Sequence, residues 1–76
     1  MYLYTIKTGA TKNKKVSKIV RNKIEKAGFK SAEVYRSEKG FYIYVTKTKD
    51  YRNAQNIANQ INEMGYSAHI ETIKEQ

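Results

Sequence analysis

The 76-residue sequence contains no cysteine and no proline, and its only histidine is His69. Without cysteine the chain can form neither a disulfide nor a thiolate metal site, and it has no thiol nucleophile. His69 lacks the several carboxylate partners, at suitable spacing, that a zinc site would need. The apolar runs are only a few residues long, too short for a transmembrane helix. We therefore expect one small domain, residues 1–76, without metal or cofactor, stabilised by packed apolar side chains.

Acidic residues are also few, seven against fifteen Lys and Arg, which gives a net charge of +8. The excess lies in residues 1–39, with eleven basic and three acidic residues, whereas residues 40–76 hold four of each. Most of it falls between Lys12 and Lys30. Such a surface attracts polyanions, among them nucleic acid, teichoic acid and the carboxylates of a cell wall. A lysine-rich helix face can equally be a solvated surface without a partner.

The first residues, 1–5, lack the basic start and the long apolar stretch of a signal peptide. We therefore expect either a cytoplasmic protein or one module of a longer chain that carries its own route of export or release.

Hydrophobic periodicity predicts four strands and two helices. The strands are expected at residues 2–8, 32–36, 41–46 and 67–73. One helix follows a cap at Thr11 or Asn13 and ends at Gly28; the other follows Asp50 and ends at Gly65. The inward stripes are Val16, Ile19, Val20, Ile24 and Ala27 in the first helix, and Ala54, Ile57, Ala58, Ile61 and Met64 in the second. The order βαββαβ predicts an α+β fold of ferredoxin-like or RRM-like topology, a four-stranded antiparallel sheet with two helices on one face.

A weak internal repeat with an offset of 37 residues supports this order, because Val20 matches Ile57, Ile24 matches Ile61 and Gly28 matches Gly65. Two βαβ halves with right-handed crossovers place both helices on one sheet face and leave the other face open.

Side-chain alternation predicts which residues line that open face. If Ile43 and Val45 point to the helices, then Tyr42, Tyr44 and Thr46 point away from them. By the same alternation the open face gathers Thr5, Lys7, Glu33, Tyr35, Tyr42, Tyr44, His69 and Glu71. Aromatic rings pack against the C–H faces of pyranose rings, and hydroxyl, amine and carboxylate groups hydrogen-bond their substituents. The first seven of these residues are the predicted binding site for a linear sugar polymer, although tyrosine also simply suits half-exposed strands.

Several short segments resemble the SPOR domains (sporulation-related repeats) of bacterial cell-wall proteins. Residues 4–10, Tyr-Thr-Ile-Lys-Thr-Gly-Ala, resemble the family's first opening strand, and residues 40–46, Gly-Phe-Tyr-Ile-Tyr-Val-Thr, its second. Lys-Ala-Gly-Phe at 26–29 and Gly-Tyr at 65–66 resemble the ends of its two helices. The sequence departs from the pattern where Lys7 replaces the usual glutamine, Thr46 the second glycine and Thr11 a common aromatic residue, and these changes bear on ligand preference more than on fold.

The resemblance implies a non-catalytic module of the cell envelope that binds peptidoglycan glycan strands, typically stretches whose stem peptides amidases have removed. It also implies attachment to an amidase, an endolysin-type or other wall hydrolase, or a division protein. It places Lys7, Tyr42 and Tyr44 in the binding groove. A lysine facing the lactyl carboxylate of muramic acid is chemically sensible. Anionic wall polymers are a further expected partner, for the basic first helix.

Two alternatives stay open. RNA binding through an RRM-like sheet is one, since Lys39-Gly40-Phe41 begins like the third-strand signature, although Ile43 stands where that signature has an aromatic residue. Homodimerisation through the open sheet is another. Glycoside hydrolysis would need a carboxylate pair such as Glu33 and Glu71, but a deep water-excluding pocket is not expected in so small a domain. We therefore expect no enzyme activity.

Overall fold

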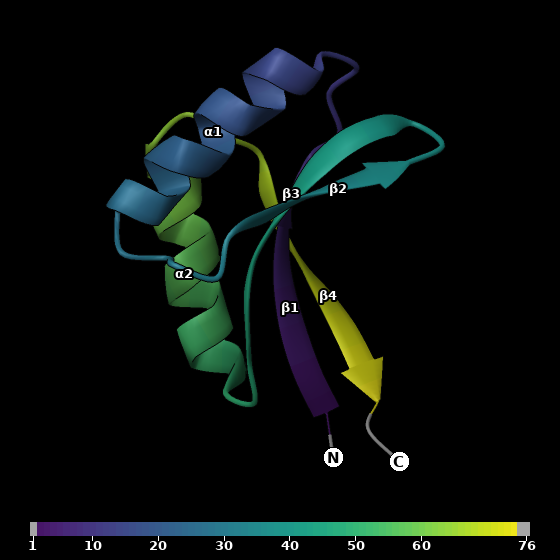
Figure 1. The fold of residues 1–76 in the computed structure, drawn as a ribbon. Helices are drawn as coiled ribbons and strands as arrows, with labels where there is room; N and C mark the ends of the chain where they lie inside the picture. The colour runs from purple at the N-terminus through teal and green to yellow at the C-terminus, as the bar shows by residue number, and fades with distance from the viewer. Residues whose placement is uncertain (1, 75–76) are drawn as a thin grey trace.

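The computed structural model describes residues 2–74 and has the predicted order of elements (Figure 1). The elements are β1 (Tyr2–Thr8), α1 (Lys14–Lys26), β2 (Glu33–Ser37), β3 (Gly40–Thr48), α2 (Tyr51–Glu63) and β4 (Ala68–Lys74). The predicted α+β fold class is therefore confirmed. The predicted domain, residues 1–76, extends beyond the described residues by residue 1 and residues 75–76.

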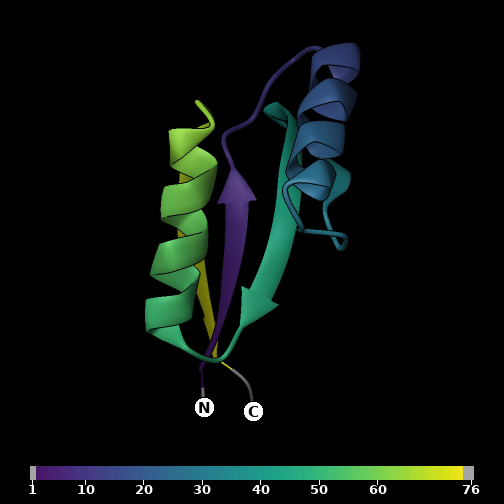
Figure 2. The same ribbon diagram turned by 90° about the vertical axis from the view of Figure 1, so that its left-hand side faces the viewer.

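The four strands form one antiparallel sheet in the order β2-β3-β1-β4. Both helices lie on the same face of this sheet, and β1 runs between them when the sheet is seen from that side (Figure 2). No element of residues 2–74 covers the opposite face (Figure 1). The sheet is thus open on one side, as the sequence predicts.

The two helices begin and end in the same way, 37 residues apart, which confirms the internal repeat. The side chain of Asn13 caps α1 by accepting from the backbone N–H groups of Lys15 and Val16, and Asp50 caps α2 by accepting from Arg52. At the other ends, Gly28 and Gly65 have φ of +113° and +96°, a backbone conformation that favours glycine. The residues after them, Phe29 and Tyr66, donate backbone hydrogen bonds of 3.3 Å to Ile24 and Ile61.

The core lies between the sheet and the helices and confirms the predicted phase of β3, since Ile43 and Val45 are 2% and 0% exposed. Its buried hydrophobic members are Ile6, Ile24, Ala32, Ile43, Val45, Ala54, Ala58 and Ile61. Tyr42 and Tyr44 alternate with Ile43 and Val45 and therefore point to the open side.

The predicted inward stripe of α1 is partly wrong. Val16 and Ile19 are 43% and 55% exposed, and Ser17 is fully buried instead. The helix is rotated so that Ser17, Val20 and Ile24 face the sheet. These three residues are the repeat counterparts of Ala54, Ile57 and Ile61, the inward residues of α2. The hydroxyl of Ser17 is satisfied inside the helix, where it donates to the carbonyl of Lys14 at 2.6 Å.

A β-bulge interrupts the pairing of β1 with β3. Ile6 pairs with Thr46 but Lys7 pairs with Tyr44, so Val45 is the extra residue on β3. Paired residues share a face of the sheet, and Ile6 belongs to the core, so Thr46 lies on the helix side. The prediction that Thr46 points to the open face is therefore wrong.

Candidate functional site on the open sheet face

A row of four side chains crosses the open face from one edge of the sheet to the other. Tyr44 of β3 pairs with Glu33 of β2 on one side and with Lys7 of β1 on the other. Lys7 in turn pairs with His69 of β4. Directly paired residues have Cβ atoms roughly 4.5–5.5 Å apart and point to the same face. These four predicted site residues, the cross-sheet row, are therefore neighbours although they lie far apart in the sequence.

Three tyrosines form a cluster at the β2 end of the cross-sheet row. The rings of Tyr35 and Tyr42 stack, with centroids 5.7 Å apart and planes 18° from parallel. Tyr44 meets Tyr35 edge to face, with centroids 6.0 Å apart. The Nζ of Lys7 lies 5.1 Å from the ring centroid of Tyr42 and reaches it from β1, the side opposite Tyr35. Both ring faces of Tyr42 are thus engaged, whereas Tyr35, on the edge strand and 42% exposed, offers the larger ring surface to a ligand.

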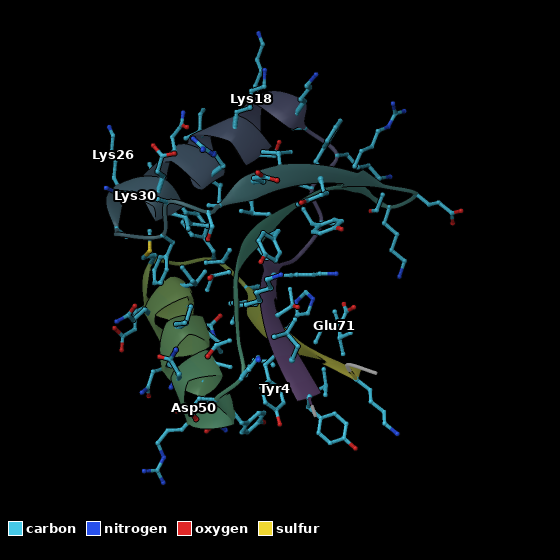
Figure 3. The ribbon with its side chains drawn as sticks, turned by 60° about the horizontal axis from the view of Figure 1, so that its bottom comes forward. Tyr4, Lys18, Lys26, Lys30, Asp50 and Glu71 are labelled. Carbon is cyan, nitrogen blue, oxygen red and sulfur yellow. The ribbon has the colours of Figure 1, made fainter. Side chains whose placement is uncertain are left out.

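Charges on the open face are nearly balanced. Lys7 forms an ion pair with Glu71, with 3.0 Å between Nζ and Oε2. Glu33 accepts a hydrogen bond from the phenol of Tyr35 at 3.0 Å. Lys18 and Lys26 of α1 and Lys30 of the loop after it, by contrast, project away from the sheet face that carries Glu71 (Figure 3). Aromatic and strongly basic surfaces therefore lie on opposite sides of the molecule.

The carboxylate of Glu33 raises the pKa of two of the phenols. Its hydrogen bond and then its negative charge raise the pKa of Tyr35 above the ordinary value of 10.0. The pKa of Tyr44 is also raised, mainly by burial and further by the charge of Glu33. Both phenols are therefore protonated at neutral pH. Tyr35 donates its proton to Glu33, so the phenol of Tyr44 is the donor that suits a ligand rich in hydroxyl and carbonyl oxygens.

Beside the tyrosines, the open face is hollowed by a depression of about 320 Å³. Its lining residues are Lys7, Thr8, Ala10, Ser37, Lys39, Tyr42, His69 and Glu71. The sequence analysis missed Ser37 and Lys39, because they lie between the strands predicted at 32–36 and 41–46, where strand alternation gives a side chain no direction. The signal that could have indicated them is their place in a hairpin, where a hydroxyl and an amine precede the aromatic strand 41–46.

No protein-family model matches the chain, and no curated protein sequence matches it. Among solved structures, the chain is similar to the solution structure of the peptidoglycan binding domain of the B. subtilis cell wall lytic enzyme CwlC. The likeness has a TM-score of 0.78 and covers 97% of this chain and 92% of that one, at 20% sequence identity. The two chains share a fold.

Six of the seven predicted site residues have exposed or half-buried side chains on the open face, and Thr5 does not. Thr5 lies on that side by its pairing with Lys47 and Glu71, but it is only 4% exposed. Its short side chain stands on a central strand between two longer neighbours. The expectation that the hydroxyl of Thr5 is available to a ligand is therefore wrong.

The geometry also bears on catalysis. Glu33 and Glu71 lie on the two edge strands, three strand spacings apart, which is about 14 Å. The carboxyl groups of glycosidase pairs are roughly 5–9.5 Å apart, whereas the backbones of these two residues are farther apart than that and their carboxylates are held by different partners, Lys7 and Tyr35. Within residues 2–74, no three His, Cys, Asp or Glu side chains come together as a metal site would require. Neither of the two described helices has the length and apolarity of a membrane span.

Proposed function

We propose that this chain is a non-catalytic module that binds peptidoglycan glycan strands through its open sheet face. It targets an attached amidase, endolysin-type hydrolase or division protein to the cell wall. The observation that carries the proposal is the cross-sheet row beside the stacked tyrosines, on a face that no described element covers. Its fold is also that of a peptidoglycan binding domain in a cell wall lytic enzyme.

The chemistry of the face suits a linear polysaccharide. The exposed ring of Tyr35 offers an apolar surface to the C–H face of a pyranose. The neutral phenol of Tyr44 can donate a hydrogen bond, the phenol oxygen of Tyr35 can accept one, and His69 and the depression beyond Tyr42 extend the surface toward β4. Because the row spans all four strands, it contacts successive sugar units of an extended chain.

We further propose that the preferred ligand is glycan stripped of its stem peptides. Removal of the peptides leaves a lactyl carboxylate on each muramic acid, and Lys7 is the cation of the cross-sheet row that can face it. Bulky peptides would also keep the sugar rings from approaching the open sheet face. Resemblance to the SPOR pattern at residues 4–10 and 40–46 supports the same preference.

RNA binding through the sheet has less support. An RRM-type sheet would place aromatic side chains at the positions of Phe41 and Ile43 on the open face, whereas Ile43 is buried in the core. Most of the excess positive charge also lies on the opposite side of the molecule, where it cannot neutralise phosphates bound along the sheet (Figure 3).

Sedimentation with purified sacculi, freed of anionic polymers, tests the proposal. We expect the protein to co-sediment, and to do so more after the sacculi are treated with an amidase. The double variant Tyr42→Ala/Tyr44→Ala should weaken retention by at least about tenfold, because it removes two of the three clustered rings.

The matched control is Tyr2→Ala/Tyr51→Ala, which removes two exposed tyrosines from the helix side of the molecule. This control should bind sacculi like the unaltered chain, and circular dichroism should show both variants folded. Undiminished retention of the Tyr42/Tyr44 variant would contradict the assignment of the site. Tight, salt-sensitive RNA binding without any retention on sacculi would contradict the proposed function itself.

A further inference from the structure

The exposed surface of α1 carries a dense group of lysines that the open-face site does not use. Its members are Lys14, Lys15, Lys18, Lys23 and Lys26, with Lys30 directly after the helix. The one acidic residue of α1, Glu25, is already paired with Arg21. None of these six lysines forms an ion pair with a carboxylate of residues 2–74. We call these six residues the lysine face, and Figure 3 shows Lys18, Lys26 and Lys30 pointing outward from it.

The second helix is an internal control for this surface, because it has the same length, caps and packing 37 residues later. The counterparts of Lys18 and Lys23 are Gln55 and Gln60, both exposed. The counterpart of Lys26 is the acidic Glu63, whereas Lys15 has a basic counterpart, Arg52. An exposed helix of this fold therefore does not require lysine at positions 18, 23 and 26.

The lysine face also has an electrostatic cost within the helix. Lys14 and Lys15 stand in the first turn, where the helix dipole disfavours positive charge, and the first turn contains no acidic residue. Lys14 and Lys18 are four residues apart, a spacing at which like charges destabilise a helix by about 0.2–0.5 kcal/mol. A bound polyanion would relieve both effects.

We propose that the lysine face binds a flexible phosphodiester polymer of the cell wall, of the teichoic-acid type. That the polymer belongs to the cell wall rests on the proposed function. The attraction of a phosphodiester polymer to the lysine face does not. Lysine suits such a polymer because its ammonium is a point charge on a mobile stem, able to follow irregularly spaced phosphates. The module would then hold glycan on one side and anionic polymer on the other.

The surroundings of the lysines favour this polymer over a nucleic acid. Proteins that bind single-stranded nucleic acid combine basic grooves with aromatic rings on which bases stack. The large apolar side chains exposed on α1 are Val16 and Ile19, which are aliphatic. The clustered tyrosines lie on the far side of the sheet. A polymer with phosphates but no bases therefore matches the surface better.

Binding to purified poly(glycerol phosphate) at several salt concentrations tests the inference. Lys18→Gln/Lys23→Gln/Lys26→Gln should weaken binding by about tenfold and flatten its salt dependence, since each lost phosphate contact removes part of the counterion release. The matched control Lys49→Gln/Arg52→Gln/Lys74→Gln removes the same net charge from exposed residues elsewhere and should change binding less than about twofold. Equal losses in both variants would show that only net charge matters and would overturn the site.

Two further measurements separate this inference from the proposed function. The lysine variant should bind polymer-free sacculi normally, and Tyr42→Ala/Tyr44→Ala should bind poly(glycerol phosphate) normally. If the unaltered chain binds the polymer but not the polymer-free sacculi, the proposed function fails and the lysine face stands. If a single-stranded oligonucleotide of equal phosphate content binds the lysine face more tightly than the polymer, the occupant is nucleic acid and the inference is overturned.

Discussion

Lys7, on the open face, contacts two other side chains at once. Its ammonium pairs with Glu71 at 3.0 Å and lies 5.1 Å from the ring centroid of Tyr42. A carboxylate on a ligand must therefore compete with Glu71 for the same cation. If the open face binds glycan as proposed, we expect Glu71 to lower the affinity for acidic sugars and to leave contacts with neutral sugars unchanged.

Replacing Glu71 with glutamine tests this competition. Glu71→Gln should strengthen binding to glycan fragments that keep the lactyl carboxylate by roughly two- to fivefold, the range expected for one exposed ion pair. Binding to neutral N-acetylglucosamine oligomers, measured by calorimetry, should not change. Glu63→Gln, on α2, removes the same charge at an exposed position and is the control. Equal strengthening for neutral and acidic ligands would contradict the competition, because the loss of the Glu71 charge would then not act through the carboxylate of the ligand.

Glu33 has a separate effect that a pH titration can measure. It raises the pKa of Tyr35, so it stabilises the fold below the ordinary tyrosine value and this stabilisation is lost as the pH rises through the raised pKa. In Glu33→Gln the negative charge is gone, and we expect Tyr35 to ionise at lower pH. Tyrosinate absorbance should record this shift, whereas Glu38→Gln, in the turn after β2, should leave the titration unchanged. An identical curve for Glu33→Gln would contradict the assigned cause.

For single residues, the sequence predicts which face of the sheet a side chain points to. It predicts less well how exposed that side chain is and which residues it contacts. Strand alternation placed Lys7, Tyr42 and Tyr44 on the open face because it depends only on phase within each strand. The burial of Thr5 depends on the side chains of neighbouring strands, and the Lys7–Glu71 pair depends on the register between β1 and β4. Neither is encoded in any one segment of the sequence.

Among the elements, α1 shows how a periodic pattern can mislead. Val16, Ile19 and Val20 suggest one apolar stripe, and the structure turns the first two outward. The internal repeat predicts the correct orientation of α1, since the inward residues Ala54 and Ile61 of α2 match Ser17 and Ile24 at the offset of 37 residues. Because serine is polar, a pattern based on hydrophobicity alone does not show that Ser17 occupies a core position.

Two alanine substitutions in α1 distinguish the two orientations of the helix. Ile24→Ala should destabilise the fold by about 2–5 kcal/mol, because Ile24 is fully buried. Ile19→Ala should change the free energy of unfolding by less than about 0.5 kcal/mol, because Ile19 is 55% exposed. Urea unfolding measures both. Comparable losses at the two positions would indicate the orientation predicted from periodicity.

The bulge in β3 lies beyond what the sequence pattern predicts. Phe41 to Thr46 reads as one uninterrupted strand, and no glycine marks the extra residue at Val45. In the structure, the hydroxyl of Ser31 donates to the carbonyl of Val45 at 2.9 Å and satisfies the backbone there. That partner lies fourteen residues away, so only the folded chain reveals it.

For the whole molecule, the strand order makes the two halves depend on each other. Every strand pair in the sheet, β2 with β3, β3 with β1 and β1 with β4, joins one half of the repeat to the other. The two strands within each half never pair. An isolated half therefore has no sheet to form, although its sequence contains a complete βαβ unit.

Peptides 1–38 and 39–76 test this dependence, because the division falls in the turn between β2 and β3. Each alone should lack a cooperative unfolding transition by circular dichroism, and an equimolar mixture should regain one. A mixture in which the second peptide carries Ile43→Asp is the control, since a charge at this buried position prevents packing. Dispersed amide resonances from either peptide alone would contradict the prediction.

The cross-sheet row constrains how such a surface can diversify over evolutionary time. Each of its members comes from a different strand, so inserting or deleting one residue within a strand would turn that member toward the helices. A change of two residues would restore the direction but move the side chain about 6.6 Å along the strand. New ligand preferences can therefore arise by replacing side chains at fixed positions, while changes in length are confined to the connections between elements.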